Sequence, residues 1–158
     1  MKQFSIILIV VALLFGSCNS ETIKLSENDY LVFGHFYGEC MGEGCVEIFR
    51  LEKDCLLEDT NDTYPSSVNF YNAKYINRSI SDFEKTKDLL SYFPDDLVKE
   101  NNTVIGQPDA GDWGGIYVEY NYNGVHKFWL IDKMKNNVPA KYHEFIDKIT
   151  VKIQQLQK

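Results

Sequence analysis

The strongest local signal for the fold is an Asn-Gly pair, Asn123-Gly124, between two segments rich in β-branched and aromatic residues. The two segments span residues 116–122 and 125–131. A two-residue loop of this composition favours a type I′ turn, so the sequence predicts an antiparallel β-hairpin. The short loop also predicts the register, which pairs Tyr122 with Val125, Tyr120 with Lys127, Val118 with Trp129 and Ile116 with Ile131.

The two faces of this hairpin differ in character. The face that carries Ile116, Val118 and Trp129 is apolar and is expected to meet helices. The opposite face mixes aromatic and polar side chains, namely Tyr117, Glu119, Asn121, His126, Phe128 and Leu130. Such a surface suits a partner protein or a glycan, because aromatic side chains supply contact energy and polar groups supply specificity. The other interpretation is that a second layer, such as the first helix, covers this face.

The remaining elements predict an α+β domain. Strands are expected at residues 30–37, 46–51 and 55–58, with a fourth at 68–76. Ser81 and Glu84 match a capping box, which predicts a helix over residues 83–93 that Pro94 ends. A second helix is expected from Pro139 onward, because six apolar residues follow at helical spacing: Tyr142, Phe145, Ile146, Ile149, Ile153 and Leu156. The predicted fold is an antiparallel sheet of about five strands with two main helices packed on one face.

The first 17 residues have the pattern of a secretory signal peptide. Lys2 precedes an apolar run from Phe4 to Phe15, and the small residues Gly16 and Ser17 follow. The run is shorter than the roughly 20 apolar residues of a membrane span. The chain of 158 residues is therefore expected to comprise a leader, residues 1–17, and one domain.

The sequence Phe15-Gly16-Ser17-Cys18 resembles the lipobox of bacterial lipoproteins, and the leader is similar to those of small Bacteroidota lipoproteins of unknown role. The resemblance implies cleavage before Cys18 and attachment of palmitate-type acyl chains to that residue. Residues 18–29 would then form a lipidated tether and residues 30–158 a single α+β domain. The absence of an Asp after Cys18 favours the outer membrane, with the protein facing the periplasm. The alternative is an ordinary signal peptide whose Cys18 forms a disulfide.

Charge excludes one class of partner. The chain has 16 Lys and Arg against 23 Asp and Glu, a formal net charge of −7. It therefore lacks the basic surface that nucleic-acid binding needs. The expected partners are the membrane, through the lipid anchor, and an envelope protein or glycan.

Three cysteines remain if Cys18 is lipidated. Cys40 and Cys45 lie at the two ends of a Gly-rich connection between predicted strands, where a disulfide is sterically easy and the envelope is oxidising. One alternative is a zinc site formed by these two residues with His35 and Cys55, although the spacing lacks the usual knuckle. The other alternative leaves all three thiols free.

The acidic loop at residues 108–115 is the best candidate ligand site. Asp109 and Asp112 offer carboxylates for Ca²⁺, and Trp113 offers a ring on which a sugar stacks. The loop does not match the EF-hand pattern. The more conservative interpretation is a tight loop whose Asp side chains cap backbone amides.

No catalytic residue, metal ligand or cofactor is predicted. His143 and Asp147 share a helix face but lack the second His of a zinc-protease helix. The pairs Glu39 with Glu43 and Glu119 with Asp112 are the acidic pairs considered for glycoside cleavage. The sequence thus favours a binding or structural module of the cell envelope, and the alternative is a small hydrolase that uses carboxylates or a bound metal.

Overall fold

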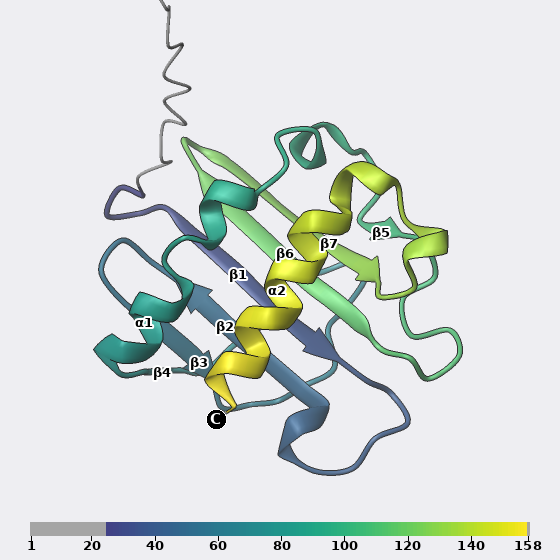
Figure 1. The fold of residues 1–158 in the computed structure, drawn as a ribbon, viewed down its shortest axis with the longest axis horizontal. Coiled ribbons are helices and arrows are strands. Elements are labelled where there is room, and N and C mark those ends of the chain that lie inside the picture. Colours follow the sequence, from purple (N-terminus) through teal and green to yellow (C-terminus); the bar gives the residue numbers. More distant parts are fainter. Residues whose placement is uncertain (1–24, 158) are drawn as a thin grey trace, which may run out of the picture.

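The computed structural model describes residues 25–157 and shows an α+β domain, in which one sheet carries helices on one face (Figure 1). The strands are β1 (Tyr30–Phe36), β2 (Val46–Leu51), β3 (Leu56–Asp59), β4 (Tyr75–Asn77), β5 (Val104–Ile105), β6 (Gly115–Tyr122) and β7 (Val125–Asp132). The α-helices are α1 (Ile80–Thr86) and α2 (His143–Leu156). Short 3-10 turns cover Glu43–Cys45, Leu89–Tyr92, Leu97–Lys99, Lys135–Asn137 and Ala140–Tyr142.

The sheet has seven strands in the order β4-β3-β2-β1-β6-β7-β5. β5 runs parallel to β7, and all other neighbours are antiparallel. The predicted α+β class with two helices is confirmed, but the prediction of about five antiparallel strands is wrong in detail. The two edge strands β4 and β5 have three residues and two residues, respectively. Segments this short are below the length at which alternation of apolar and polar residues identifies a strand.

The predicted hairpin and its register are confirmed. Tyr122 pairs with Val125 and Ile116 with Ile131, as expected from the Asn123-Gly124 turn. Both turn residues have positive φ, 51° for Asn123 and 77° for Gly124, which is the backbone that a type I′ turn requires.

The main core lies between the sheet and the helices. The apolar hairpin face meets α2 there, and the helix contributes Phe145, Ile146, Ile149, Ile153 and Leu156. The residues that the sequence placed at the start of this helix, from Pro139, form a 3-10 turn at Ala140–Tyr142 instead. Its Tyr142 side chain is nevertheless fully buried. The apolar stripe therefore identified the buried face correctly, although it placed the first helical turn too early.

The N-terminal cap of α1 differs from the prediction. Ser79, not Ser81, is the N-cap, and its hydroxyl accepts a hydrogen bond of 3.1 Å from the Asp82 amide. The predicted helix also ends early: α1 stops at Thr86, and a separate 3-10 turn follows. The Thr86 hydroxyl donates to the carbonyls of Asp82 and Phe83 within this last turn.

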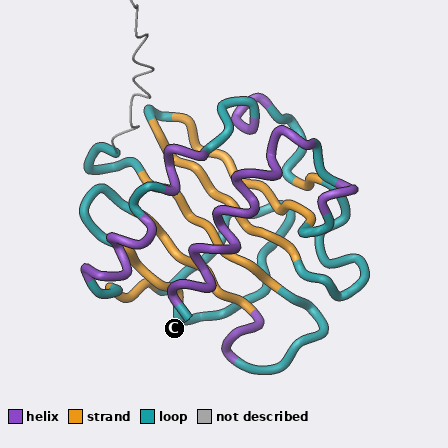
Figure 2. Tube along the Cα trace, in the orientation of Figure 1, coloured by secondary structure: helices purple, strands orange, loops and turns teal. Residues whose placement is uncertain are grey.

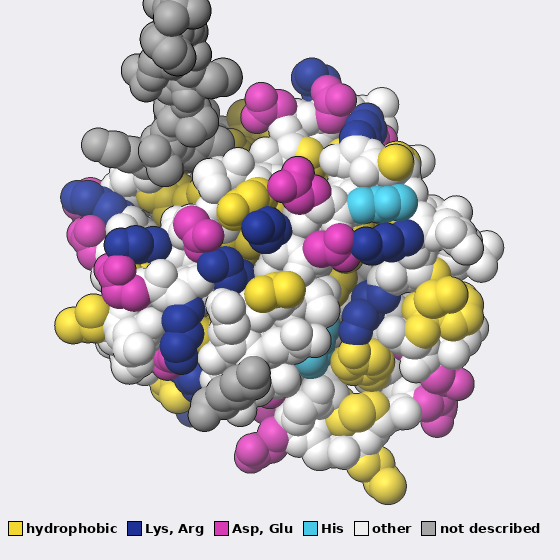
Figure 3. Space-filling view, viewed as in Figure 1, with side chains coloured by type: hydrophobic (Ala, Val, Ile, Leu, Met, Phe, Trp, Pro, Cys, Tyr) yellow, Lys and Arg dark blue, Asp and Glu magenta, His cyan; other side chains and the backbone are white. Residues whose placement is uncertain are grey.

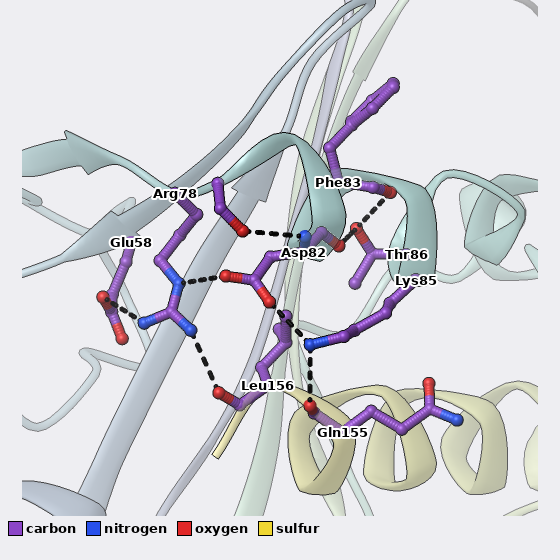
Figure 4. Close-up of polar contacts among 9 residues, drawn as sticks. Glu58, Arg78, Asp82, Phe83, Lys85, Thr86, Gln155 and Leu156 are labelled. Carbon is purple, nitrogen blue, oxygen red and sulfur yellow. Dashed lines mark hydrogen bonds and ion pairs between the residues drawn. The ribbon is translucent and has the colours of Figure 1, made fainter. Parts of the chain in front are cut away.

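The earlier start of α1 places Asp82 in a network of ion pairs (Figure 4). Arg78 Nε lies 3.1 Å from Asp82 Oδ2. Arg78 Nη1 lies 3.0 Å from Glu58 Oε2. Arg78 Nη2 also donates to the Leu156 carbonyl at the end of α2. Lys85 Nζ donates to the other Asp82 oxygen at 2.8 Å. One Arg and one Asp thus join β3, α1 and α2.

The second face of the sheet is covered by chain without regular secondary structure. The predicted strand at 68–76 is wrong for most of its length, because only its last two residues fall in β4. Residues 60–74, here called the covering segment, pass behind the strands as coil (Figure 2). Tyr71 of this segment packs against a second apolar cluster on the sheet that includes Val32, Ile48, Tyr117 and Leu130.

Asp59 attaches the covering segment to the end of β3. Its buried carboxylate accepts hydrogen bonds from the Asp62 amide, the Lys74 amide and the Tyr71 hydroxyl. These donors include a backbone amide near each end of the segment, and the Thr60 amide also donates to the Lys74 carbonyl, so the two ends are held together without a β-ladder.

The chain enters the domain through residues 25–29, which the sequence assigned to a tether. Leu25 is buried in the main core, and the Asp29 carboxylate accepts hydrogen bonds from Ser26 and from the Asn123 amide. Within residues 25–157, no helix combines the length and the hydropathy needed to cross a bilayer.

Candidate functional site

A buried carboxylate lies at the centre of the covered face. Glu119 is in the middle of β6, and its relative exposure is 6%. Its Oε2 accepts a hydrogen bond of 2.7 Å from the Tyr117 hydroxyl, and its Oε1 accepts one of 3.0 Å from the Tyr30 hydroxyl. His126 Nε2 lies 2.9 Å from the same Oε1. A buried carboxylate needs such donors, because its desolvation is otherwise unfavourable by several kcal/mol.

His126 links this buried carboxylate to the surface. Its side chain is 39% exposed, and the hairpin register places it opposite Asn121. Because a carboxylate only accepts hydrogen bonds, the contact with Glu119 assigns the imidazole proton to Nε2. The ring also stacks on Phe70 of the covering segment, with 3.8 Å between centroids and 18° between planes.

The tyrosines around Glu119 stay protonated well above neutral pH. Burial, followed by the charge of Glu119, raises the pKa of Tyr30 to about 12. The same two causes raise the pKa of Tyr117 still further. The Arg50 guanidinium lies 3.8 Å from the centre of the Tyr30 ring, on the side of the cluster toward β2. The phenolic groups therefore act as fixed hydrogen-bond donors to the carboxylate.

The Phe70–His126 pair borders a cleft of about 240 Å³, here called the His126 cleft. It is lined by Phe70, Glu100, Asn101, Asn102, Thr103, His126, Lys127, Phe128 and Trp129. Phe70 is 43% exposed, so part of its ring is available to a ligand. Asn101 and Asn102 are both exposed and both line the cleft. The cleft thus combines an aromatic surface with two exposed side-chain amides.

The sequence identified only part of this cleft and of the buried cluster beside it. Tyr117, Glu119, His126 and Phe128 were expected on one hairpin face, and they do lie together. The expectation that this face is open is wrong for Tyr117, Glu119 and Phe128, which are buried. Phe70 and residues 100–103 were not predicted, since only the tertiary fold brings these distant segments to the hairpin.

The helix-bearing face has a larger hollow of about 670 Å³, but polar and charged side chains line it, namely Glu84, Lys85, Asp88, Lys152 and Gln155. Acidic and basic side chains are interspersed on this face, with isolated apolar side chains between them (Figure 3). His143 and Asp147, the two residues of the zinc-protease-like helix pattern, are both engaged there. His143 Nε2 lies 2.9 Å from the Val138 carbonyl, and Asp147 pairs with Lys135 at 2.7 Å.

The acidic loop uses Asp109 to hold itself closed. One Asp109 oxygen accepts from the Gly38 amide at 2.6 Å and from the Tyr64 hydroxyl at 3.0 Å. The other accepts from the Gly114 amide at 2.9 Å. Asp112 is exposed, with a φ of 60°. The Asp109 carboxylate thus has the capping role that the conservative interpretation of this loop describes.

Trp113 is engaged by a residue that the sequence did not single out. Its indole Nε1 donates to Asp132 Oδ1 at 2.8 Å. Asp132 is fully buried at the end of β7 and also accepts from the Gln107 amide, the Met134 amide and the Asn137 side-chain amide. An Asp immediately after an apolar hairpin strand is the one sequence signal that marks this position.

Cys40 and Cys45 are joined in a disulfide, with their Cα atoms 5.6 Å apart. Of the other residues in the alternative zinc set, His35 Nε2 lies 3.0 Å from the Gly44 carbonyl and Cys55 is free beside Glu52. Burial raises the pKa of the Cys55 thiol, and the charge of Glu52 raises it further. Within residues 25–157, no group of three or more His, Cys, Asp or Glu side chains is placed to hold a metal ion.

Glu119 and Asp112, one of the two carboxylate pairs considered, do not form a separate site. Glu119 belongs to the buried tyrosine cluster, whereas Asp112 lies in the exposed loop. Glu43 instead borders an acidic cavity of about 240 Å³ with Glu47, Glu58, Asp59 and Asp62. Burial raises the pKa of both Glu47 and Asp62, and neighbouring carboxylates add to the effect.

Cys18, the predicted lipidation site, lies outside the described residues. No protein-family model matches the chain, and none of the curated proteins gives a significant match.

Proposed function

We propose that the protein is a lipoprotein of the bacterial cell envelope, anchored through acyl chains on Cys18 after removal of residues 1–17. The apolar leader that ends in Gly16-Ser17-Cys18 supports this proposal. Each buried CH₂ of an acyl chain contributes about 0.8 kcal/mol, and two or more chains make an anchor effectively permanent. The location that agrees best with Asn19 after the Cys is the outer membrane, on its periplasmic side.

The anchor is tested by mass spectrometry of protein isolated from membranes. The expected N-terminal peptide begins at Cys18 and carries acyl chains. The variant Cys18→Ser is expected in the soluble fraction, and Cys55→Ser is the matched control. Recovery of Cys18→Ser in the membrane at the wild-type level would contradict the anchor.

The role we propose for the domain is binding, with the His126 cleft as the site. The observation that carries this role is the stacked Phe70–His126 pair. Both rings are partly exposed, and the contact of His126 Nε2 with buried Glu119 fixes the imidazole in place. A site held rigidly by buried groups loses little conformational entropy when it binds. The cleft, at about 240 Å³, is smaller than the roughly 300–1,000 Å³ of sites that enclose a drug-sized molecule. A cleft of this size suits one unit of a larger partner, namely one sugar of a glycan or one side chain of a protein.

A glycan is the partner that this chemistry favours. The aromatic rings offer an apolar surface to the C–H face of a sugar. The amides of Asn101 and Asn102 both donate and accept hydrogen bonds, which matches hydroxyl groups. A protein partner that inserts one side chain is the second outcome of the test.

The binding role is tested with the soluble Cys18→Ser protein on an array of bacterial envelope saccharides, followed by calorimetric titration of the saccharide that binds. Phe70→Ala and Asn102→Ala are each expected to weaken binding about tenfold, since a truncated contact residue costs about 1.4 kcal/mol. Asn136→Ala, at an exposed position away from the cleft, is the control and should bind as the wild type does. Absence of saccharide binding, together with crosslinking of a protein at the cleft in cells, would replace the glycan by a protein partner.

The contact between Glu119 and His126 also favours one second candidate, a small envelope hydrolase. A carboxylate that orients an imidazole is the arrangement of a general base. Thr103 carries the hydroxyl among the lining residues, and it donates to the Ser67 carbonyl at 2.9 Å. Turnover in a broad hydrolase screen that His126→Gln or Glu119→Gln abolishes, with Asp109→Asn and Asp112→Asn as comparisons, would favour the hydrolase over the binding module.

A further inference from the structure

The two ends of the sheet carry different loops. Leu31 pairs with both Leu51 and Tyr120, so the start of β1 lies beside the ends of β2 and β6. This end, here called the turn end, carries the Asn123-Gly124 turn and the β2–β3 turn (Figure 1). Phe36 pairs with Val46 and Gly115 at the opposite end. That end, here called the loop end, carries the disulfide loop and the acidic loop.

The N-terminal segment is fixed at the turn end. Asp29 Oδ1 accepts a hydrogen bond of 3.1 Å from the Asn123 amide, and the Asn28 carbonyl accepts one of 3.3 Å from the Asn121 side chain. Glu27 pairs with Lys53 of the β2–β3 turn at 2.5 Å. The chain therefore joins the domain at one defined point.

The length of chain before that point limits how the domain sits on a membrane. Six residues lie between Cys18 and Leu25, so the two residues are seven Cα steps apart, which span at most roughly 25 Å when fully extended. A folded domain of this length is roughly 35 Å across. A lipid on Cys18 thus keeps the turn end near the bilayer, and the tether is too short for the loop end to reach it.

The distribution of acidic residues favours the same orientation of the domain on the bilayer as the short tether does. Exposed acidic residues gather at the loop end, where Glu39 and Glu43 flank the disulfide and Asp112 lies in the acidic loop. The acidic cavity with Glu47 and Asp62 is at this end as well. At the turn end, the exposed acids Glu27 and Asp54 both lie near Lys53, which offsets part of their charge. Anionic headgroups repel the loop end more strongly, within about a Debye length of 8–10 Å.

We infer that the turn end is a membrane-facing surface, whose partner is the bilayer that holds the lipid anchor. This inference rests on the proposed lipidation of Cys18. Val125, which follows the Asn123-Gly124 turn and is 38% exposed, faces the headgroups. The disulfide loop and the acidic cavity point away from the bilayer. Because His126 follows Val125 directly, the His126 cleft lies in the half of the domain nearer the membrane.

The test compares two reporter positions in the full lipidated protein, reconstituted into vesicles of phosphatidylcholine and phosphatidylglycerol with brominated acyl chains. Val125→Trp places an indole at the turn end, and Met41→Trp places one at a fully exposed position of the disulfide loop. The wild type gives the background of Trp113 and Trp129. The added emission of Val125→Trp is expected to be quenched, and that of Met41→Trp is expected to stay unquenched.

The outcomes separate the orientation from the anchor. If the wild type does not float with the vesicles, the proposed lipidation is wrong, and the orientation inferred from it is wrong as well. If the protein floats but both added indoles are quenched equally, or Met41→Trp is quenched more, the orientation alone is overturned. Circular dichroism of both variants checks that each retains the wild-type fold.

Discussion

Asp132 is a buried side chain that joins the acidic loop, through Trp113, to the chain segments before it and after β7. It accepts four hydrogen bonds, three from the loops on either side of it and one from the Trp113 indole. All four distances lie between 2.7 and 2.9 Å, and the residue is fully buried. Such a carboxylate positions backbone that no strand or helix holds.

Asp132→Asn is therefore expected to lower the free energy of unfolding by about 3 kcal/mol, because the new amide directs N–H groups at donors that had a charged acceptor. Urea denaturation measures the change, and Trp113 fluorescence reports the loop. The matched control is Asp112→Asn at an exposed position, which should change stability by less than about 0.5 kcal/mol. Equal effects of the two variants would contradict this role for Asp132.

The disulfide between Cys40 and Cys45 closes a short loop, with a sequence separation of five. Peptide mapping without reduction should recover both residues in one linked fragment of the exported protein. The double variant Cys40→Ser, Cys45→Ser should lose about 2 kcal/mol of stability, since a loop this short restricts the unfolded chain only modestly. Cys55→Ser is the control. If freshly isolated protein instead contains stoichiometric zinc, and removing the zinc unfolds it, these thiols are metal ligands and do not form a disulfide.

The start of α1 shows how a helix boundary depends on its surroundings. Both Ser79 and Ser81 are residues that cap helices, and each is followed three positions later by an acid. Starting at Ser79 puts Asp82 between Arg78 and Lys85, which join the helix to β3 and α2. Local sequence permits both starts, and the ion pairs favour the first.

Ser79→Ala is expected to destabilise the protein by about 1 kcal/mol, because the Asp82 amide loses its acceptor. Ser81→Ala, inside the helix and exposed, should leave stability unchanged or raise it by a few tenths of a kcal/mol. Chemical denaturation of the two variants in parallel measures the difference. A larger loss for Ser81→Ala would indicate that the helix begins at the later serine.

The distribution of tyrosines determines how the whole molecule responds to alkali. Burial is the first cause that raises the pKa of Tyr30 and of Tyr120 to about 12, against an ordinary value of 10. The pKa values of Tyr71, Tyr75 and Tyr117 are raised beyond that. The folded protein therefore retains phenolic protons that the unfolded chain releases.

Stability is expected to be independent of these tyrosines below pH 10 and to fall from about pH 10 to pH 12, where the folded groups ionise. The sign follows because a raised pKa in the folded state favours the protonated form. Urea midpoints measured from pH 8 to 12, with tyrosine absorbance recorded in parallel, test this. Tyr120→Phe should make the decline shallower, and an unchanged slope in that variant would contradict the role of Tyr120.

Only part of the candidate site was accessible to prediction. The hairpin register placed Glu119 and His126 near one another, because paired strands have a period of two. Nothing in the local sequence indicated that Phe70 stacks on His126 or that Thr103 hydrogen bonds to Leu130. Those contacts join residues between 27 and 56 positions apart, and such separations carry no periodic signal.

The sequence by itself determined the β6–β7 hairpin, its register and the buried face of α2, because turn chemistry and apolar spacing act between near neighbours in the chain. Only the tertiary structure decided what covers the second face of the sheet. The covering segment has no strand or helix pattern and is held by Asp59 and by the contact of Tyr71 with Tyr117. The same holds for the edge strands β4 and β5, whose few residues pair only because a neighbouring strand already presents unpaired backbone groups.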